Sequence, residues 1–241
     1  MLCSKKQAMQ TATITVGARP SPLSKAQLKE VEAELKAFHS DIAFFTQFVT
    51  TVGDRDRSTS LRSMGRTDFF TKEIDEGQLR GDFRVAIHSA KDLPEPLAKG
   101  LKLVALTKGV DPTDSLVFRE GDSLKSLPPF SKIATSSERR EEMVRTLRSD
   151  LLFVDIRGNI DERLKQLFDR KVDGVVIAEA ALIRLGLTHL NRMKLPGETA
   201  PLQGQLAIIA REDDLEMEEL FRCIDSRKKM SKASIPFELK V

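Results

Sequence analysis

The feature that most constrains the fold of this sequence is a repeated alternation of short apolar runs with segments of helical periodicity. The run 12–18 alternates in the manner of a strand. Apolar residues then recur every three or four positions at Leu28, Val31, Leu35 and Phe38, which is typical of an amphipathic helix. Strands that alternate with helices predict an α/β fold built on a mostly parallel sheet.

The alternation continues along the chain and predicts two halves. We expect a crossing between them at the turn 111–114 and a returning strand at 206–210. The first domain would comprise residues 12–107 plus 205–226, and the second residues 108–204, with tails at 1–11 and 227–241. A ligand would lie in the cleft between the halves. The other strands are expected at the start of 84–94 and at 43–51, 101–106, 132–135, 152–156 and 174–178. Helices are expected at 69–79, 137–148 and 214–226. A further helix would start at residue 160, and another would follow the strand 174–178 and end at residue 185.

Composition excludes several classes of protein. The 241 residues carry a net charge of only +3 and include no Trp or Tyr, so a broad nucleic-acid-binding face is not expected. Two cysteines, Cys3 and Cys223, cannot form a disulfide framework or a zinc cluster, and no metal is predicted. Apolar runs are too short for a signal peptide or a membrane span. We therefore expect a cytoplasmic protein without a membrane or nucleic-acid partner, and a monomer.

The stretch 84–94 opens as an apolar strand and closes with polar side chains before a proline. Ser89, Lys91 and Asp92 would then stand at the carboxyl end of a strand, where ligands bind in open α/β sheets. An ordinary strand followed by a solvated turn is the alternative interpretation.

Other predicted strands end in a similar way. Thr135, Ser136 and Ser137 lead into a helix whose free N–H groups could hold an anion, although they could equally cap a helix with solvated arginines. Gly158 allows close approach of the backbone. The cations placed at or just past strand ends are Arg19, Lys91, Arg139, Arg140, Arg157 and Arg163. In a chain of balanced charge, this placement predicts a ligand with several carboxylates or phosphates.

Asp92 is the odd group among these cations. It could stabilise a cationic centre that forms during a reaction, or it could move a proton. An ion pair with Lys91 or a neighbouring arginine is the alternative. The polar segment 53–68 has almost no periodicity and predicts a long mobile loop of the kind that often forms a lid.

Several motifs, in order, closely resemble one enzyme family. They are VGARPSPLSKAQ, the pair Gly53–Asp54, TKEID, VAIHSAKDLP, ATSSERR, IRGNIDERL and PLQGQLAI. From about residue 15 to 211 the chain resembles hydroxymethylbilane synthase, also called porphobilinogen deaminase.

The resemblance implies two hinged, doubly wound α/β domains of the type II periplasmic-binding-protein kind. It also implies an enzyme of haem (tetrapyrrole) biosynthesis that joins four porphobilinogen molecules into hydroxymethylbilane and releases ammonia each time. The chain grows on a dipyrromethane cofactor linked to a cysteine. By carry-over, Asp92 would be catalytic. Arg19, Lys91, Arg139, Arg140, Arg157 and Arg163 would bind acetate and propionate groups, and Ser21, Ser89, Thr135, Ser136, Ser137, Gly158 and Gln205 would make further substrate or cofactor contacts.

The sequence departs from the family pattern in two places. The family's active-site loop carries a lysine where this chain has Thr67, and the neighbouring Arg66 would supply the charge instead. The family's third, α+β domain carries the primer cysteine, and this sequence ends before it, so a non-covalently held or absent cofactor is expected. The alternatives are a non-catalytic pyrrole or polycarboxylate binder and a hinged periplasmic-type anion binder, against which the missing signal peptide argues.

Overall fold

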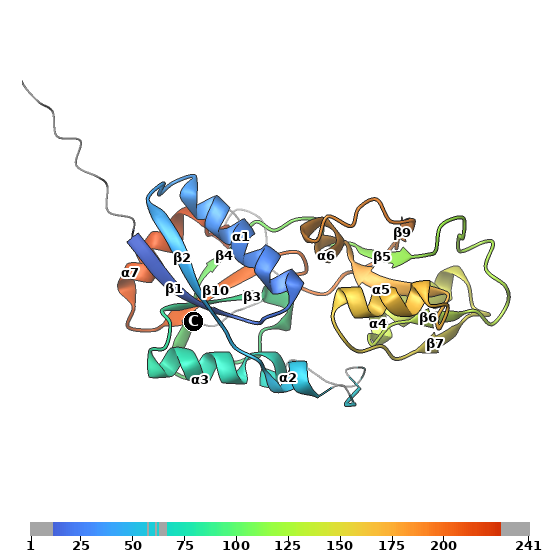
Figure 1. Ribbon diagram of the computed structural model, residues 1–241, viewed down its shortest axis with the longest axis horizontal. Coiled ribbons are helices and arrows are strands. Elements are labelled where there is room, and N and C mark those ends of the chain that lie inside the picture. Colours follow the sequence, from blue (N-terminus) through green and yellow to red (C-terminus); the bar gives the residue numbers. More distant parts are fainter. Residues whose placement is uncertain (1–11, 57, 61, 63–66, 228–241) are drawn as a thin grey trace, which may run out of the picture.

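The computed structural model describes residues 12–56, 58–60, 62 and 67–227. Two five-stranded sheets, each flanked by helices, form two units placed end to end (Figure 1). The elements in chain order are β1 (Ala12–Ala18), α1 (Pro22–Lys36), β2 (Ile42–Phe48), α2 (Val52–Arg55), η1 (Asp68–Phe70), α3 (Lys72–Arg80), β3 (Val85–Ser89), η2 (Ala90–Asp92), β4 (Leu101–Leu106), β5 (Asp114–Val117), β6 (Lys132–Ala134), α4 (Glu138–Leu147), β7 (Leu152–Val154), α5 (Ile160–Phe168), β8 (Gly174–Ala178), α6 (Glu179–Arg184), β9 (Arg192–Lys194), β10 (Leu206–Arg211), α7 (Leu215–Phe221) and η3 (Arg222–Ile224).

The first sheet has the strand order β2-β1-β3-β10-β4 and is covered on both faces. On one face, Leu28 and Val31 of α1 and Phe221 of α7 pack into a core with the strand residues Val16 and Val85. On the other face, Ile74 of α3 and Phe83 pack against Ala86. Burial on both faces explains why the central strands β3 and β10 are continuous apolar runs rather than alternating ones.

The second sheet has the order β7-β6-β8-β5-β9 and is doubly covered in the same way. Successive residues of β8 point to opposite faces. Val175 and Ile177 pack with Leu164 of α5, whereas Val176 packs with Val144 of α4. The fold class is therefore that expected from the sequence: two doubly wound α/β units.

Both sheets are mostly parallel, as predicted, because four of the five strands in each run in the same direction and only one runs against them. In the first, β10 runs antiparallel to β3 and β4. In the second, β5 runs antiparallel to β8 and β9. These are the strands next to the crossings, where the chain enters the second unit through β5 and returns through β10.

Two short strands escaped the sequence analysis. Asp114 was assigned to a turn, yet it begins β5, and all four residues of that strand are buried. A buried aspartate is tolerated there because two arginines pair with it. The edge strand β9 has only three residues, too few to show a periodicity.

Some predicted boundaries also change. Gly53 and Asp54 lie in α2, not in a loop, because Thr51 and Asp54 form a capping box at its start. The predicted lid segment 53–68 lies partly outside the described residues, and Arg66 lies wholly outside them. The last predicted helix is divided into α7 and η3. Within the described ranges, no helix has the length and apolarity needed to cross a membrane.

Candidate active site

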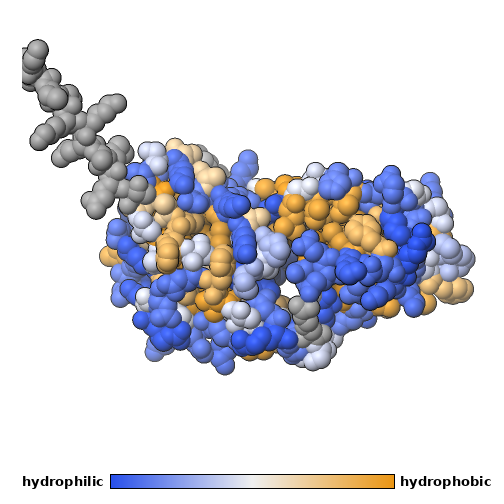
Figure 2. Space-filling view, viewed as in Figure 1, coloured by the Kyte–Doolittle hydropathy of each residue, from blue (hydrophilic) through white to orange (hydrophobic). Residues whose placement is uncertain are grey.

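A cleft of about 850 Å³ lies between the two units. Both sheets contribute to its walls, and the lower part of the boundary between the lobes carries mainly hydrophilic and intermediate residues (Figure 2). A cleft of this size suits a small organic ligand, and polar groups converging from two units would fix its orientation.

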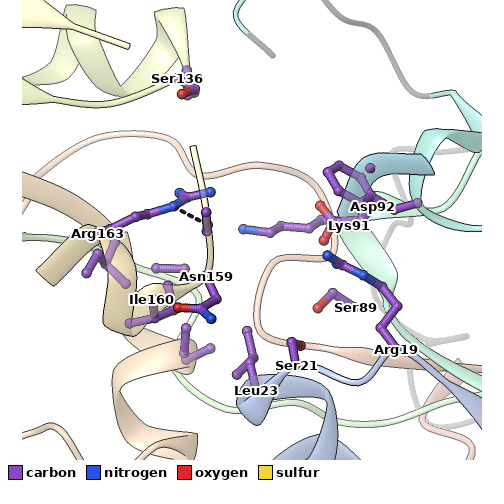
Figure 3. Close-up of a pocket in the computed structure, with 18 of the residues that line it drawn as sticks. Arg19, Ser21, Leu23, Ser89, Lys91, Asp92, Ser136, Asn159, Ile160 and Arg163 are labelled. Carbon is purple, nitrogen blue, oxygen red and sulfur yellow. Dashed lines mark hydrogen bonds between the residues drawn. The ribbon is translucent and has the colours of Figure 1, made fainter. Parts of the chain in front are cut away.

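The parallel strands of both sheets direct their carboxyl ends toward this cleft. In the first unit, Arg19 follows β1, and η2 carries Lys91 and Asp92 directly after β3. In the second, Ser136 follows β6 and Arg157 follows β7. Figure 3 shows Lys91 and Asp92 entering the cleft from one side and Arg163 from the other. The ligand position expected at strand ends is therefore present in the geometry.

Most of the predicted site residues line this single cleft. Thr135 is buried beneath it, 1% exposed, and its Oγ1 accepts a hydrogen bond from the Ser137 N–H at 3.3 Å. Arg66 lies outside the described residues. The predicted residues in the lining are Arg19, Ser21, Ser89, Lys91, Asp92, Ser136, Ser137, Arg139, Arg140, Arg157, Gly158, Arg163 and Gln205.

Asp92 is exposed to the cleft. Its carboxylate makes no hydrogen bond or ion pair with any residue in the described part of the chain, so the predicted alternative of an ion pair with Lys91 is not observed. Lys91 beside it is half-buried, and its Nζ donates to Gln203 Oε1 at 3.0 Å. Burial, together with the charge of Arg140, lowers the pKa of Lys91 to about 8.

Arg163 makes a single hydrogen bond within the described part of the chain. Its Nε donates to the Gly158 carbonyl at 2.9 Å, and its two terminal nitrogens bond to no described residue. Burial, with the charges of Arg140 and Arg157, lowers the pKa of Arg163 to about 10. At neutral pH the guanidinium still carries its charge, and an anion in the cleft would offset the cost of holding it there.

Arg139 and Arg140 line the cleft and also contact a carboxylate of the protein itself. Both bind the fully buried carboxylate of Asp114, at 2.6 Å from Arg139 Nη2 and 2.6 Å from Arg140 Nη2. Burial acts to raise the pKa of Asp114, but Arg140 and Arg139 outweigh it and lower that pKa. One carboxylate shared by two arginines leaves a net positive charge at the wall of the cleft. The predicted N-cap Ser137 makes no side-chain capping bond.

Arg19 and Arg157 both line the cleft and bond to residues of the first unit. Arg19 Nε donates to Asp54 at 3.0 Å, and its guanidinium stacks 4.5 Å from the centroid of the Phe70 ring. Arg157 reaches across from the second unit and donates to the Asp56 carbonyl at 2.7 Å. Its Nε is buried without a partner in the described structure. Arg157 therefore bridges the units while keeping an unsatisfied donor.

The predicted hydroxyl and amide groups are anchored locally. Ser21 caps α1, Ser89 Oγ accepts from Gln27 at 2.7 Å, and Gln205 donates to the Thr107 carbonyl at 2.9 Å. Ser136 bonds to Asp155 and to the Ile156 backbone. Gly158 has φ +99°, a left-handed conformation that favours glycine, and a Cβ there would meet Glu162 Oε2 at 2.6 Å.

Four polar residues in or beneath the cleft escaped the sequence analysis. Asp54 had a signal, since it belongs to the quoted Gly-Asp pair, but no role was assigned to it. Gln203 also had one, since it belongs to the quoted motif PLQGQLAI, but no role was assigned to it either. Asp114 and Arg62 had none, because their partners lie far away in sequence. Arg62 pairs with Glu141, and Gln203 contacts both units.

Cys223 does not face the cleft. Its thiol packs against the core of the first unit and donates to the Leu220 carbonyl at 3.3 Å. Burial raises the pKa of the thiol. It is the one cysteine among the described residues, since Cys3 lies outside them.

Comparison with known families and proteins agrees with these features. A family model described as "Porphobilinogen deaminase, dipyromethane cofactor binding domain" matches residues 14–219. A porphobilinogen deaminase of Streptococcus sanguinis is 38% identical over 229 residues, which cover 92% of this chain and 75% of that protein. The enzyme of Deinococcus radiodurans is 40% identical over 220 residues, covering 88% of this chain and 71% of its own.

A solved structure shows the same fold at low sequence identity. The periplasmic substrate-binding protein of an ABC transporter from Coxiella burnetii matches with a TM-score of 0.55 and 15% identity, covering 88% of this chain and 91% of that one. At this identity the likeness concerns the fold alone. It confirms the predicted arrangement of the type II periplasmic-binding-protein kind.

Proposed function

This chain belongs to the porphobilinogen deaminase family, and from that premise we propose that it joins four porphobilinogen molecules head to tail into hydroxymethylbilane, with release of one ammonia per molecule. The observation that carries the proposal is the position of Asp92. It is an exposed carboxylate that pairs with no described residue, in a cleft whose lining also includes Lys91 and several arginines. Porphobilinogen has this complementary pattern of charge: carboxylate side chains on a pyrrole ring that becomes cationic during reaction.

The cations would bind the acetate and propionate groups. Arg163 is best placed, since two of its nitrogens have no partner among the described residues. Lys91 and Arg157 would add contacts, the latter through its unpaired Nε. Charge-assisted bonds of this kind are stronger than neutral ones and fix the ring in one orientation.

Asp92 would act on the ring nitrogen. Loss of ammonia from the protonated aminomethyl group breaks a C–N bond, and the electron pair of the ring nitrogen replaces it to give an azafulvenium cation. The carboxylate of Asp92 would accept a hydrogen bond from the ring N–H and stabilise the positive charge of the ring. The next C–C bond forms when the terminal pyrrole of the growing chain attacks the exocyclic methylene. The proton displaced from the attacking carbon leaves through a base, a role that Asp92 can also fill.

The described residues also fit a dipyrromethane cofactor, which carries four carboxylates. The cleft holds more cationic donors than one porphobilinogen requires, and Arg157 Nε is buried and unpaired. Arg139, Arg140 and Arg157, with Ser136 and Ser137, would hold this group on the wall formed by the second unit. When bound, it supplies the free pyrrole carbon at which the chain grows.

Two titrations test the proposal by calorimetry. Porphobilinogen is expected to bind to the protein, and its methyl esters, which lack the charged carboxylates, are not. Equal affinity for porphobilinogen and for its methyl esters would show that the cations of the cleft do not recognise the carboxylates. Tight binding without any consumption of porphobilinogen would favour the alternative, a non-catalytic pyrrole binder.

The replacement Arg163→Met is expected to weaken porphobilinogen binding by about 10- to 150-fold, the loss of a charge-assisted contact worth roughly 1.5–3 kcal/mol. The fold should not be weakened, because burial and neighbouring cations already disfavour the charge at this position. Calorimetry and thermal unfolding check both parts. A variant that unfolds at a lower temperature but binds porphobilinogen with normal affinity would show that Arg163 has a structural role and not a binding role. Arg163→Lys should rescue binding only in part, since the fork is lost.

Intact-mass spectrometry of the denatured 241-residue polypeptide is expected to give the mass of the bare chain. Cys223 is half-buried against the core of the first unit, its thiol pKa is raised, and it lies outside the cleft. Only a thiolate facing the cleft could form a thioether to a dipyrromethane bound there. A dipyrromethane adduct mapped to Cys223 or Cys3 would contradict this expectation.

A further inference from the structure

The side-chain amide of Gln203 lies at the point where the chain returns from the second unit to the first. It is buried, 4% exposed, just before β10. Its oxygen accepts from Lys91 Nζ at 3.0 Å and, more weakly, from Arg140 Nη2 at 3.5 Å. Its nitrogen donates to the Pro112 carbonyl at 2.6 Å and to Asp114 Oδ1 at 3.0 Å. All four hydrogen-bonding positions of the amide are thereby used.

These partners come from both units. Lys91 follows β3 of the first sheet, whereas Asp114 begins β5 of the second and Arg140 lies on α4. Gln203 is therefore the link through which the Lys91 ammonium is tied to the opposite wall of the cleft. A lysine side chain has four rotatable bonds, so a fixed acceptor is needed to hold its charge in one place.

The neutrality of the amide matters as much as its position. Lys91, Arg139 and Arg140 converge here against the carboxylates of Asp114 and Asp92, which leaves a local excess of positive charge. A glutamate at position 203 would cancel part of that excess and would repel Asp114 across the contact that the amide nitrogen now makes. A glutamine supplies an acceptor for Lys91 and a donor for Asp114 without changing the charge of the cleft.

We propose that Gln203 is a positioning residue that holds the Lys91 ammonium toward a carboxylate of the substrate. The substrate class rests on the proposed function, whereas the contact itself does not. The charged groups that face Lys91 are Asp92 on its own turn, Asp114 on β5, and Arg139 and Arg140 on α4. Removing the amide oxygen takes away an acceptor that stabilises the ammonium and leaves the arginines' repulsion in place.

The first measurement is the pH dependence of Lys91 acylation by acetic anhydride, read on the Lys91 peptide by mass spectrometry. Only the unprotonated amine reacts, and in the unchanged protein the midpoint should lie near pH 8. Gln203→Met keeps the volume and removes the hydrogen bonds, so its midpoint should fall by roughly one pH unit. Gln203→Glu should raise it. Coincident midpoints in the unchanged protein and Gln203→Met would overturn the proposal.

The second measurement is steady-state kinetics with porphobilinogen. Gln203→Met should raise KM about tenfold and leave kcat nearly unchanged, the signature of lost ground-state binding. Gln78→Met is the matched control, because Gln78 is a fully buried amide that donates to two carbonyls away from the cleft. It should lower the thermal midpoint without moving the Lys91 titration or KM. A shifted titration in a protein that neither binds nor consumes porphobilinogen would support the contact and contradict the proposed substrate.

Discussion

The replacement Asp92→Asn is expected to lower the turnover of porphobilinogen by about a hundredfold or more. Asparagine has nearly the same shape but no negative charge, so it cannot stabilise a cationic pyrrole or take up a proton. Asp92 is exposed and makes no hydrogen bond with a described residue, so the fold should be unaffected. Stopped assays of porphobilinogen consumption, with calorimetric binding and a thermal melt, separate these effects.

Asp161→Asn is the matched control for this experiment. Asp161 is another exposed carboxylate in the lining of the cleft, on the first turn of α5. The same loss of one negative charge there should leave turnover within about twofold, since screening by solvent weakens its effect on the site. Near-normal turnover of Asp92→Asn, or equal losses in the two variants, would remove Asp92 from the mechanism.

The replacement Asp114→Asn is expected to have the largest effect on stability. It leaves Arg139 and Arg140 without the buried carboxylate that now accepts bonds from both. Breaking a buried pair by removing one partner costs about 3–5 kcal/mol. Because both arginines retain some exposure, we expect about 3 kcal/mol, or roughly 6–12 °C in the thermal midpoint. Asp169→Asn, which breaks the exposed pair with Lys165, should lower the thermal midpoint far less.

The pH dependence gives the Asp114 prediction a second readout. The folded-state pKa of Asp114 is lowered, so its contribution to stability is present above the ordinary aspartate pKa of about 3.9 and is lost as the pH falls below it. The difference in midpoint between the unchanged protein and Asp114→Asn should therefore shrink as the pH falls below about 4. A constant difference would show that the destabilisation does not arise from the ionised carboxylate.

The sequence predicted those parts of the site that depend on local order. A strand followed at once by Arg19, Lys91 or Arg157 places that residue at the carboxyl end of a sheet, and the structure brings these ends together at one cleft. The family resemblance read from the motifs is confirmed by the match over residues 14–219. Both conclusions required only residues adjacent along the chain.

The pairing within the site could not be predicted in the same way. Arg139 and Arg140 line the cleft, but their bonds to Asp114 were not predicted. Asp114 is 25 and 26 positions away and reaches them through an antiparallel strand that the sequence did not reveal. Gln203 contacts Lys91 from 112 positions away. Contacts of this kind depend on how the two units meet, and no periodicity along the chain encodes them.

The stoichiometry of ammonia release is the most direct test of the central claim that this cleft condenses porphobilinogen. Purified protein is incubated with porphobilinogen, and loss of the substrate, free ammonia and linear tetrapyrrole are measured in the same samples. We predict one ammonia per porphobilinogen consumed, one tetrapyrrole per four consumed, and loss of both products in Asp92→Asn. Porphobilinogen that binds in the cleft without any release of ammonia would contradict the claim.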